Sequence, residues 1–225
     1  MAFAHLHVHT EYSLLDGSNK IREYVARVKE LGMNSAAITD HGVMYGVIDF
    51  YRAAREAGIK PILGCEVYVA PNSRFDKELT GGEDRYHHLV LLAENDTGYH
   101  NLMKIVSRAF TEGYYYKPRV DYELLETYHE GIIALSACLA GEVQRNLARG
   151  MYEEGKKAAL HYEQIFGKGN FFLELQDHGI PEQRTVNQQL MRLSQEIGID
   201  LVATNDVHYT LSLIHISEPT RRRGI

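Results

Sequence analysis

The sequence alternates between short apolar runs and longer amphipathic segments along most of its length. Each apolar run is predicted to form a strand, and the segments between these runs carry apolar residues at helical spacing. The predicted strands are Ala4–His9, Ser35–Thr39, Pro61–Ala70, Leu89–Ala93, Ile132–Ser136, Phe171–Leu175 and Leu201–Thr204. This alternation predicts an α/β barrel rather than an open sheet, because no glycine fingerprint of a dinucleotide-binding sheet follows the first strand.

The predicted helices begin and end at residues that favour helix termini. Ser18 is expected to cap a helix over Asn19–Leu31, and Gly32 is expected to end it. A second helix over Val47–Ala57 is expected to end at Gly58. The remaining helices are expected over Gly98–Ala109 (begun by Asp96 or Thr97), Tyr122–Thr127, Glu142–Ala148, Tyr152–Phe166 and Glu182–Ile197.

The composition excludes several classes of protein. The chain has 225 residues, of which 44% are hydrophobic, and its net charge is -6, so it can bury a core and is not expected to be disordered. No window approaches the ~20 apolar residues of a membrane-spanning helix, and the first residues do not resemble a signal peptide. The two cysteines provide no disulfide framework, so we expect a cytoplasmic protein without a membrane partner. The acidic balance argues against nucleic-acid binding through bulk charge.

Histidine is frequent in this chain, with 12 residues against no tryptophan. The first predicted strand closes as His5-Leu6-His7-Val8-His9. Because alternate residues of a strand share a face, His7 and His9 are expected to point at the same place, and His5 could join them. Imidazole is a favoured ligand of transition metals. The motif by itself is equally compatible with an exposed run of histidines.

Further residues of ligand type follow or interrupt the other predicted strands. They are Asp16 after the first strand, His41 in Thr39-Asp40-His41-Gly42, Glu66 in Gly64-Cys65-Glu66, Cys138 in Ser136-Ala137-Cys138, and Asp206 and His208 in Asn205-Asp206-Val207-His208. Each has an ordinary alternative role, since Glu66 could pair with a cation, Cys138 could be a small buried residue and Asp16 could belong to a turn. At the ends of barrel strands, however, they would meet at one mouth. Such a mixed set predicts a multinuclear Zn²⁺, Mn²⁺ or Fe²⁺ site suited to the hydrolysis of phosphate esters.

These motifs resemble those of a known family. His7-Val8-His9-Thr10, Thr39-Asp40-His41-Gly42, Gly64-Cys65-Glu66 and Asn205-Asp206-Val207-His208 are similar to motifs of the PHP (polymerase and histidinol phosphatase) domain. Further segments resemble the N-terminal PHP domain in the alpha-subunit family of bacterial DNA polymerase III, namely His5–Gly17, His88–Asn95, Gly98–Leu102 and Ser136–Glu142. The resemblance implies a distorted seven-stranded (β/α)7 barrel similar to a TIM barrel, in agreement with the repeat pattern.

The resemblance also implies up to three metal ions, of Zn²⁺ or Mn²⁺ and with Fe²⁺ as a third choice. Carried over motif by motif, the ligands would be His7, His9, Glu66 and Asp206 for the first ion, Glu66 again with His88 and Cys138 for the second, and Asp16, His41 and His208 for the third. His88 precedes the predicted strand Leu89–Ala93, so the choice of His88 over His87 rests on the motif alone.

The activity that the resemblance implies is a 3′–5′ exonuclease that proofreads the primer strand by phosphodiester hydrolysis. The catalytic residues would be Asp206, Glu66 and His9, and the DNA partner would be a primer 3′ end. Two alternatives stay open. One is a stand-alone phosphoesterase of the histidinol-phosphatase type, and the other is a metal-stabilised structural scaffold without catalysis.

Several basic and aromatic residues could contact such a DNA strand. Arg119, Lys117 and Tyr114–Tyr116 are candidates for positioning phosphates or stacking on unpaired bases, although a packed tyrosine loop explains them equally well. The histidines outside the motifs are expected to be ordinary surface or packing residues, except that His178 follows a predicted strand; the others are His100, His129 and His161.

The resemblance covers residues 1–210, which we expect to form one PHP domain. The polymerase active site, and the contacts with the sliding clamp and other replisome subunits, would lie in a longer chain beyond this domain. The polar, glycine-rich residues 71–86 are expected to form a surface loop. Residues 211–225 break the α/β rhythm and carry three consecutive arginines, so we expect a non-native or truncated tail there.

Overall fold

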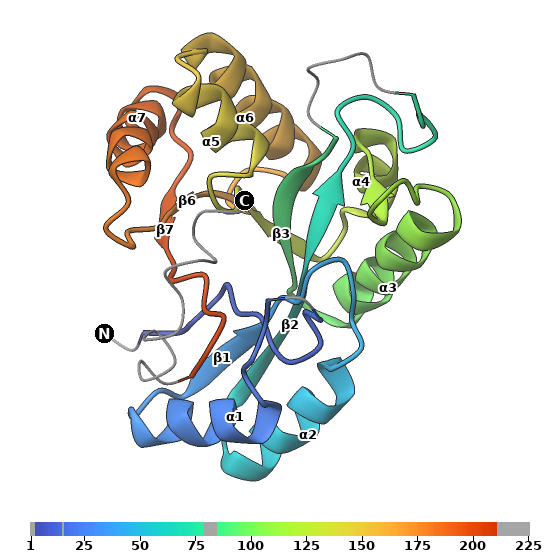
Figure 1. Cartoon of the computed structure of the whole chain (residues 1–225), viewed down its shortest axis with the longest axis vertical. Coiled ribbons are helices and arrows are strands. Elements are labelled where there is room, and N and C mark those ends of the chain that lie inside the picture. Colours follow the sequence, from blue (N-terminus) through green and yellow to red (C-terminus); the bar gives the residue numbers. More distant parts are fainter. Residues whose placement is uncertain (1–2, 15, 79–84, 211–225) are drawn as a thin grey trace.

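One curved sheet forms the centre of the molecule. In the computed structural model, which describes residues 3–14, 16–78 and 85–210, β1, β2, β3, β5, β6 and β7 follow one another in a seven-stranded sheet and β4 pairs with β2. The strands are β1 (Ser35–Ile38), β2 (Lys60–Val69), β3 (His87–Ala93), β4 (Arg119–Val120), β5 (Ile132–Leu135), β6 (Phe171–Leu175) and β7 (Leu201–Ala203). The curled sheet with its surrounding helices confirms the distorted α/β barrel expected from the sequence (Figure 1).

Helices cover this sheet on several sides. In Figure 1, α1 and α2 lie below β1 and β2, α3 and α4 lie to the right, and α5, α6 and α7 lie at the top. The helices are α1 (Ile21–Glu30), α2 (Val47–Ala57), α3 (Asp96–Thr111), α4 (Tyr122–Tyr128), α5 (Glu142–Ala148), α6 (Tyr152–Phe166) and α7 (Pro181–Ile197). Within the part of the chain that the structure describes, no helix is both long and apolar enough to cross a membrane.

The apolar core lies between the sheet and these helices. One cluster joins Ile38 of β1 to Phe50 of α2 and to residues of α1. A larger cluster joins Leu91 of β3 and Leu102 of α3 to the inner faces of α4, α5, α6 and α7. Burying a side chain of this size contributes ~1.5–3 kcal/mol, so these contacts hold the strands in place. The polar residues at the strand ends are thereby fixed at one end of the barrel.

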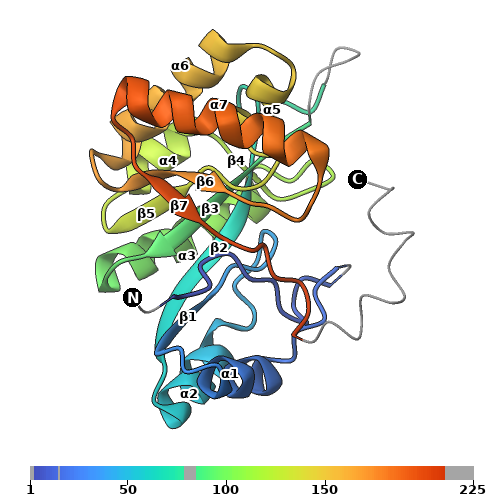
Figure 2. The ribbon, with the colours of Figure 1, turned by 90° about the vertical axis from the view of Figure 1, so that its left-hand side faces the viewer.

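The first predicted strand pairs with neighbours on both sides, but only through isolated bridges. His5 pairs with Ala36 of β1, and Val8 pairs with Val207 beyond β7. The backbone N–H of His9 donates to the carbonyl of Val207 at 2.7 Å, and the N–H of Ala37 donates to the carbonyl of His5 at 2.9 Å. The segment predicted over Ala4–His9 is therefore not a continuous strand, yet it connects the two ends of the sheet (Figure 2).

β3 is antiparallel to the strands on both of its sides. It pairs antiparallel with both β2 and β5, whereas β1–β2, β5–β6 and β6–β7 are parallel. The described residues between β2 and β3 contain no helix, and parallel pairing would need a crossover connection, usually a helix. The connection is the predicted loop over residues 71–86, of which 79–84 lie outside the described residues. The short strand β4 was not predicted; it adds two residues beside β2.

Two helix starts differ from the sequence expectation. α1 begins at Ile21 after Lys20, whose side chain does not cap it, while the Glu11 carboxylate accepts from the N–H of Ile21 at 3.4 Å. The Ser18 hydroxyl, predicted as the cap, instead donates to the carbonyl of His208 at 3.3 Å. α3 begins at Asp96 and is capped by the Asn95 side chain, which accepts from the N–H of Gly98 at 3.0 Å. The predicted caps, Asp96 or Thr97, were therefore one or two residues late, because asparagine caps as well as aspartate does.

Candidate metal centre

The residues that the motifs single out converge at one end of the barrel. Some come from the segment before β1 and some from within β2 and β3. The others come from the segments that follow β1, β5 and β7. The converging residues are His7, His9, Asp16, His41, Glu66, His88, Cys138, Asp206 and His208. Glu66 lies near their centre, because its carboxylate is within 3.5 Å of His7, His9, His41 and His88.

The first set lies around the end of the opening segment. The Nε2 of His7 is 3.3 Å from Glu66 Oε1 and 3.3 Å from Asp206 Oδ1. The Nε2 of His9 is 3.5 Å from Glu66 Oε2 and 3.2 Å from Asp206 Oδ1. Both imidazoles thus present the same ring nitrogen to the same two carboxylates, as alternate residues of one extended segment can. These four residues are the set expected to hold the first ion.

His88 and Cys138 lie on another side of Glu66. The Nδ1 of His88 is 3.0 Å from Glu66 Oε1, and the sulfur of Cys138 is 3.7 Å from the same His88 nitrogen. The antiparallel course of β3 explains the placement of His88. His88 pairs in register with Tyr68, near the end of β2, so the start of β3 lies at the mouth where the parallel strands end. The strand predicted over Leu89–Ala93 began too late.

The third set is centred on His41. Its Nε2 is 3.1 Å from Asp16 Oδ2 and its Nδ1 is 2.7 Å from Glu66 Oε2. The His9 ring lies between the His41 and His208 rings, with centroids 4.1 Å and 4.3 Å away. Gly42 follows His41 with φ +65°, and a side chain there would lie 2.9 Å from Pro118 and Tyr68. Glycine is therefore required for the turn that places His41.

The positions of two residues of the centre depend on left-handed backbone conformations, which residues other than glycine rarely adopt. Asp206 has φ 45° and Ala137, which precedes Cys138, has φ 63°. A non-glycine residue in this region costs on the order of 1–3 kcal/mol, and such strain concentrates at functional sites. Placing Asp206 and Cys138 in the centre therefore lowers the stability of the fold.

The electrostatics of the centre are strongly coupled. Burial opposes ionisation of Glu66, but His88, His7 and His41 outweigh it and hold the pKa of Glu66 well below its usual range. Burial also opposes the charge on His41, yet Glu66 and Asp16 raise the pKa of His41 to about 10. Burial, together with the charge on His41, lowers the pKa of His9 to about 3. Burial raises the pKa of the Cys138 thiol. Without an ion, the centre therefore holds charged Glu66 and His41 together with neutral His9 and Cys138.

The atoms that face the middle of the centre are left without hydrogen bonds. Buried and unpartnered atoms include Nε2 of His7, Nε2 of His9, Oε2 of Glu66 and Oδ1 of Asp206. Buried polar atoms are rarely left in this state. Three groups of ligand atoms lie within 4.8 Å of one another, namely those of His7, His9 and Glu66, of His9, His41 and His208, and of His41, Glu66 and His88. Imidazole and carboxylate donors at this spacing fit Zn²⁺, Mn²⁺ or Fe²⁺.

Four of the other described histidines lie outside the centre. His5 is half-buried and packs edge-on against Phe3, with ring centroids 5.0 Å apart. The Nε2 of His178 lies 2.8 Å from the carbonyl of Asn205 and its Nδ1 lies 3.0 Å from Gln183, so it braces the loop before Asp206. His100 and His129 contact carbonyls of their own helices.

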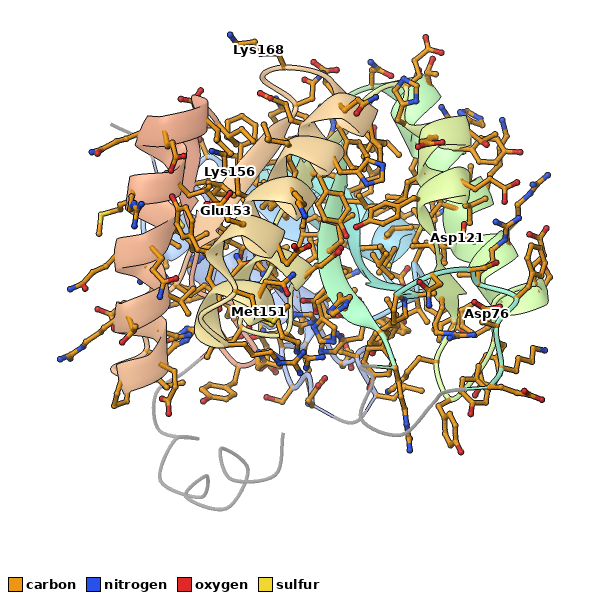
Figure 3. The ribbon with its side chains drawn as sticks, turned by 90° about the horizontal axis from the view of Figure 1, so that it is seen from above. Asp76, Asp121, Met151, Glu153, Lys156 and Lys168 are labelled. Carbon is orange, nitrogen blue, oxygen red and sulfur yellow. The ribbon has the colours of Figure 1, made fainter. Side chains whose placement is uncertain are left out.

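The candidates for phosphate contact separate into different roles. Arg119 is fully buried, and its guanidinium donates to the carbonyls of Gly113, Arg74 and Asp76. The expectation that Arg119 positions phosphate is therefore wrong, because its donors are used inside the protein. Figure 3 shows Asp76 with Asp121 on one side of the molecule, away from Met151 and Lys156.

Lys117 and the tyrosine loop are differently placed. Lys117 Nζ is 5.3 Å from the centroid of the Tyr68 ring. That ring lies 5.3 Å from the His88 ring and 6.0 Å from the His41 ring, so Lys117 stands at the rim of the centre. Tyr114 and Tyr116 are exposed, whereas Tyr115 packs over Arg119.

Sequence reasoning missed three polar residues behind the imidazoles. Glu174, Ser13 and Asp40 are buried and lie behind His7 or His9. The signal for Glu174 was present, since it is a carboxylate within an apolar strand, as Glu66 is. For Ser13 and Asp40 the sequence carries no comparable signal.

The fold and the site together define a class of protein, an α/β barrel with a cluster of metal-ligand side chains at one mouth. The sequence model of the PHP domain matches residues 5–178, which is more than half of the chain. The chain belongs to the PHP domain family.

The chain is also similar in sequence to two bacterial proteins that share a name. The chain is 51% identical over 210 residues to the DNA polymerase III subunit alpha of Treponema pallidum, and this match covers 93% of the chain and 18% of the relative. It is 49% identical over 214 residues to the protein of the same name from Deinococcus radiodurans, covering 92% of the chain and 16% of the relative. The chain therefore spans less than a fifth of the length of these relatives.

Solved structures with the same fold are more distant in sequence. An amidohydrolase from Chromobacterium violaceum matches with a TM-score of 0.59 at 16% identity, over 92% of this chain and 88% of that one. A protein described as a metal-dependent phosphoesterase from Bifidobacterium adolescentis matches with a TM-score of 0.53 at 17% identity, over 91% of this chain and 87% of that one. At these identities the likeness concerns the fold.

Proposed function

We propose that this chain is the PHP domain of a bacterial replicative DNA polymerase of the alpha-subunit type, and that its centre supports a 3′–5′ exonuclease. The observation that carries the proposal is the convergence of nine ligand-type side chains at the barrel mouth, where Glu66, one of the nine, lies within 3.5 Å of four imidazoles. The similarity to alpha subunits over 210 residues supports the polymerase context. In that context the DNA partner is a primer 3′ end, the other partners are replisome subunits such as the sliding clamp, and the location is the cytoplasm.

The donor set defines what the centre would hold. His7, His9, Glu66 and Asp206 would hold one ion, and Glu66 with His88 and Cys138 a second. Asp16, His41 and His208 would hold a third. Bound divalent ions of the Zn²⁺, Mn²⁺ or Fe²⁺ type supply Lewis acidity for phosphodiester hydrolysis. Asp206, Glu66 and His9 are the proposed catalytic residues, and Nε2 of His9 lies 3.2 Å from Asp206 and 3.5 Å from Glu66.

The residues at the rim of the centre are an argument for a nucleic-acid strand as the substrate. Lys117 provides a cation beside the centre, and the rings of Tyr68 and Tyr86 contact each other and the His88 ring. Basic side chains next to aromatic ones are typical of sites that hold single-stranded nucleic acid. We propose residues 1–210 as the domain; the tail expected over residues 211–225 lies outside the described residues.

The test is cleavage of a 3′-labelled primer with a terminal mismatch by the chain loaded with Mn²⁺ or Zn²⁺. We expect release of the terminal nucleotide, loss of release with a chelator, and loss of release in Asp206→Asn. Asp200→Asn is the matched control, because Asp200 is exposed and precedes β7 at the other end of the strand. Hydrolysis of a small phosphate monoester without cleavage of DNA would indicate the stand-alone phosphoesterase instead.

A structural scaffold is the second candidate, and the burial of the centre favours it. His7, His9 and Glu66 are almost completely buried, so metal binding there would contribute directly to folding. Under this alternative, Asp206→Asn unfolds at a lower temperature than the wild type, and neither protein cleaves DNA.

A further inference from the structure

Glu174 is a buried carboxylate that does not belong to the nine-residue set. It lies in β6, whose other residues are all apolar, and it is 1% exposed. A carboxylate in such surroundings is costly unless donors surround it. The contacts of Glu174 therefore indicate its role.

Three donors converge on one oxygen of Glu174. Its Oε1 lies 2.7 Å from Nδ1 of His7 and accepts from the amide of Gln176 at 2.9 Å and from the hydroxyl of Thr204. An ionised carboxylate can only accept hydrogen bonds. The His7 contact is thus a hydrogen bond when Nδ1 of His7 carries a proton.

The other nitrogen of His7 is then free to act as a ligand. Nε2 lies 3.3 Å from both Glu66 Oε1 and Asp206 Oδ1, and it has no hydrogen-bond partner among the described residues. A neutral imidazole with its proton on Nδ1 carries its lone pair on Nε2. The geometry of Glu174 therefore matches the orientation that a metal ligand at His7 needs.

His9 is oriented in the same sense but by a neutral group. Its Nδ1 lies 3.2 Å from the hydroxyl of Ser13, and that hydroxyl donates to Asp40 at 3.0 Å. Both imidazoles thus direct Nε2 at Glu66 and Asp206. They differ at Nδ1, which lies against a carboxylate in His7 and against a hydroxyl in His9.

The backbone at Glu174 is held as well. Its N–H donates to the hydroxyl of Ser136 at 2.8 Å, and the amide of Gln144 donates to the same hydroxyl at 2.6 Å. Gln144 in turn is buried at the start of α5. The carboxylate is therefore placed by β5, β6 and α5 together rather than by a flexible loop.

We propose that Glu174 is a positioning residue, which fixes His7 with its proton on Nδ1 and its Nε2 lone pair aimed between Glu66 and Asp206. The inference rests on the proposed function only in requiring a metal centre, and it requires no cleavage of DNA. Carboxylates that accept from the outer nitrogen of a metal-bound histidine fix its tautomer and raise its strength as a ligand.

The test compares Glu174→Gln with the wild-type 225-residue chain and uses zinc alone as the probe. We expect zinc affinity, measured by competition with a chromophoric chelator, to fall about 10–100-fold. In ¹⁵N spectra of the zinc-loaded protein, we expect His7 to show the Nδ1–H tautomer in the wild type and a mixed pattern in Glu174→Gln.

Asp121→Asn is the matched control. Asp121 is also a buried carboxylate; it accepts from Arg74 at 2.8 Å and caps α4, away from the centre. We expect Asp121→Asn to lower the melting temperature while leaving zinc affinity and the His7 tautomer unchanged. Glu174→Asp, which shortens the side chain but keeps its charge, should recover part of the lost affinity.

The outcomes separate this inference from the proposed function. Wild-type affinity and an unchanged tautomer in Glu174→Gln would overturn the role of Glu174 alone. A wild-type chain that binds zinc but does not cleave DNA would overturn the exonuclease and leave Glu174 in place. A wild-type chain that takes up no zinc would overturn both.

Discussion

The Nδ1 of His41 lies 2.7 Å from Oε2 of Glu66. Glu66 is 1% exposed and also lies within 3.5 Å of three other imidazoles, so a single carboxylate serves every part of the cluster. A residue in this position would share its two oxygens among several ions. The whole centre should therefore depend on Glu66 more than on any one histidine.

The first prediction concerns the variant Glu66→Gln. An amide is a poor metal ligand and cannot balance the positive charge of ions and imidazolium groups. We expect zinc affinity to fall by more than the ~100-fold that loss of an outer partner causes. Isothermal titration with zinc is the measurement. Glu94→Gln is the control, because Glu94 is exposed beyond the other end of β3. Equal affinities for Glu66→Gln and Glu94→Gln would contradict the central role of Glu66.

The second prediction concerns pH. The carboxylates of Glu66 and Asp16 overcome the opposing effect of burial and raise the pKa of His41 to about 10, above the ordinary value of 6.5. In the metal-free protein His41 is therefore a doubly protonated imidazolium at pH 7.5, and an ion that binds a ring nitrogen must displace one proton. The apparent zinc affinity should rise as pH increases from 6.5 towards 9.

Proton release tests this prediction directly. Zinc titrations in two buffers of different ionisation enthalpy give the number of protons released, and His41→Asn should release fewer than the wild type. The Cys138 thiol, whose pKa burial raises, should contribute a further proton on binding as thiolate. A zinc affinity that does not change with pH would be the opposite result.

Much of the centre follows from spacing along the sequence. His7 and His9 are two residues apart in an extended segment, so both project from one face. Asp206 and His208 are also two residues apart, but the φ of 45° at Asp206 means that strand alternation does not explain how this pair is placed. The rule that functional residues gather at strand ends then brings Glu66 beside these pairs. The convergence of these five residues was therefore predictable without any tertiary information.

The placement of His88 could not be derived from the pattern. A repeat of strands and helices predicts parallel strands, in which a residue before the strand lies at the wrong end. Only the reversed direction of β3 brings His88 beside Tyr68 at the mouth. That reversal agrees with the lack of a crossover helix among the described residues between β2 and β3, and residues 71–86 carried too weak a signal to decide the pairing.

Burial was the second quantity that the sequence did not supply. Arg119 follows three tyrosines, Lys117 and Pro118, a context typical of a nucleic-acid contact, yet it is fully buried. Glu174 has the same apolar context as Glu66, and only the tertiary contact with His7 distinguishes a group behind the centre from one within it. Side chains that depend on distant partners cannot be assigned from local pattern.

The third prediction uses the two cysteines as an internal comparison. Cys138 lies 3.7 Å from His88, whereas the thiol of Cys65 is fully buried and donates to the carbonyl of Asp40 at 3.3 Å. We expect the cobalt-loaded chain to show a near-ultraviolet sulfur-to-cobalt charge-transfer band. The band should disappear in Cys138→Ser and persist in Cys65→Ser. Retention of the band in Cys138→Ser would remove Cys138 from the ligand set.

The fourth prediction separates the roles of two basic residues at the start of β4, Lys117 before the strand and Arg119 within it. Arg119→Met removes the guanidinium that donates to the buried carbonyl of Arg74 and to the carbonyl of Asp76, while the carbonyl of Gly113 keeps the backbone N–H of residue 119 as a donor. Each unsatisfied buried group costs ~1–3 kcal/mol, so we expect the free energy of unfolding to fall by about 2–4 kcal/mol in urea denaturation. Lys117→Met removes a partly exposed cation at the rim, and we expect stability to change by less than about 0.5 kcal/mol.

Binding of a single-stranded oligonucleotide should show the reverse order. Lys117→Met should weaken binding several-fold at low salt and reduce its salt dependence, because one phosphate contact is lost. Arg119→Met, measured where it is still folded, should bind as the wild type does, since its guanidinium faces only carbonyls and the Tyr115 ring. Fluorescence anisotropy with a labelled oligonucleotide distinguishes the two variants. If Arg119→Met weakened binding and Lys117→Met did not, the strand would have to approach the centre from the Arg119 side, and the rim at Tyr68 would not be its path.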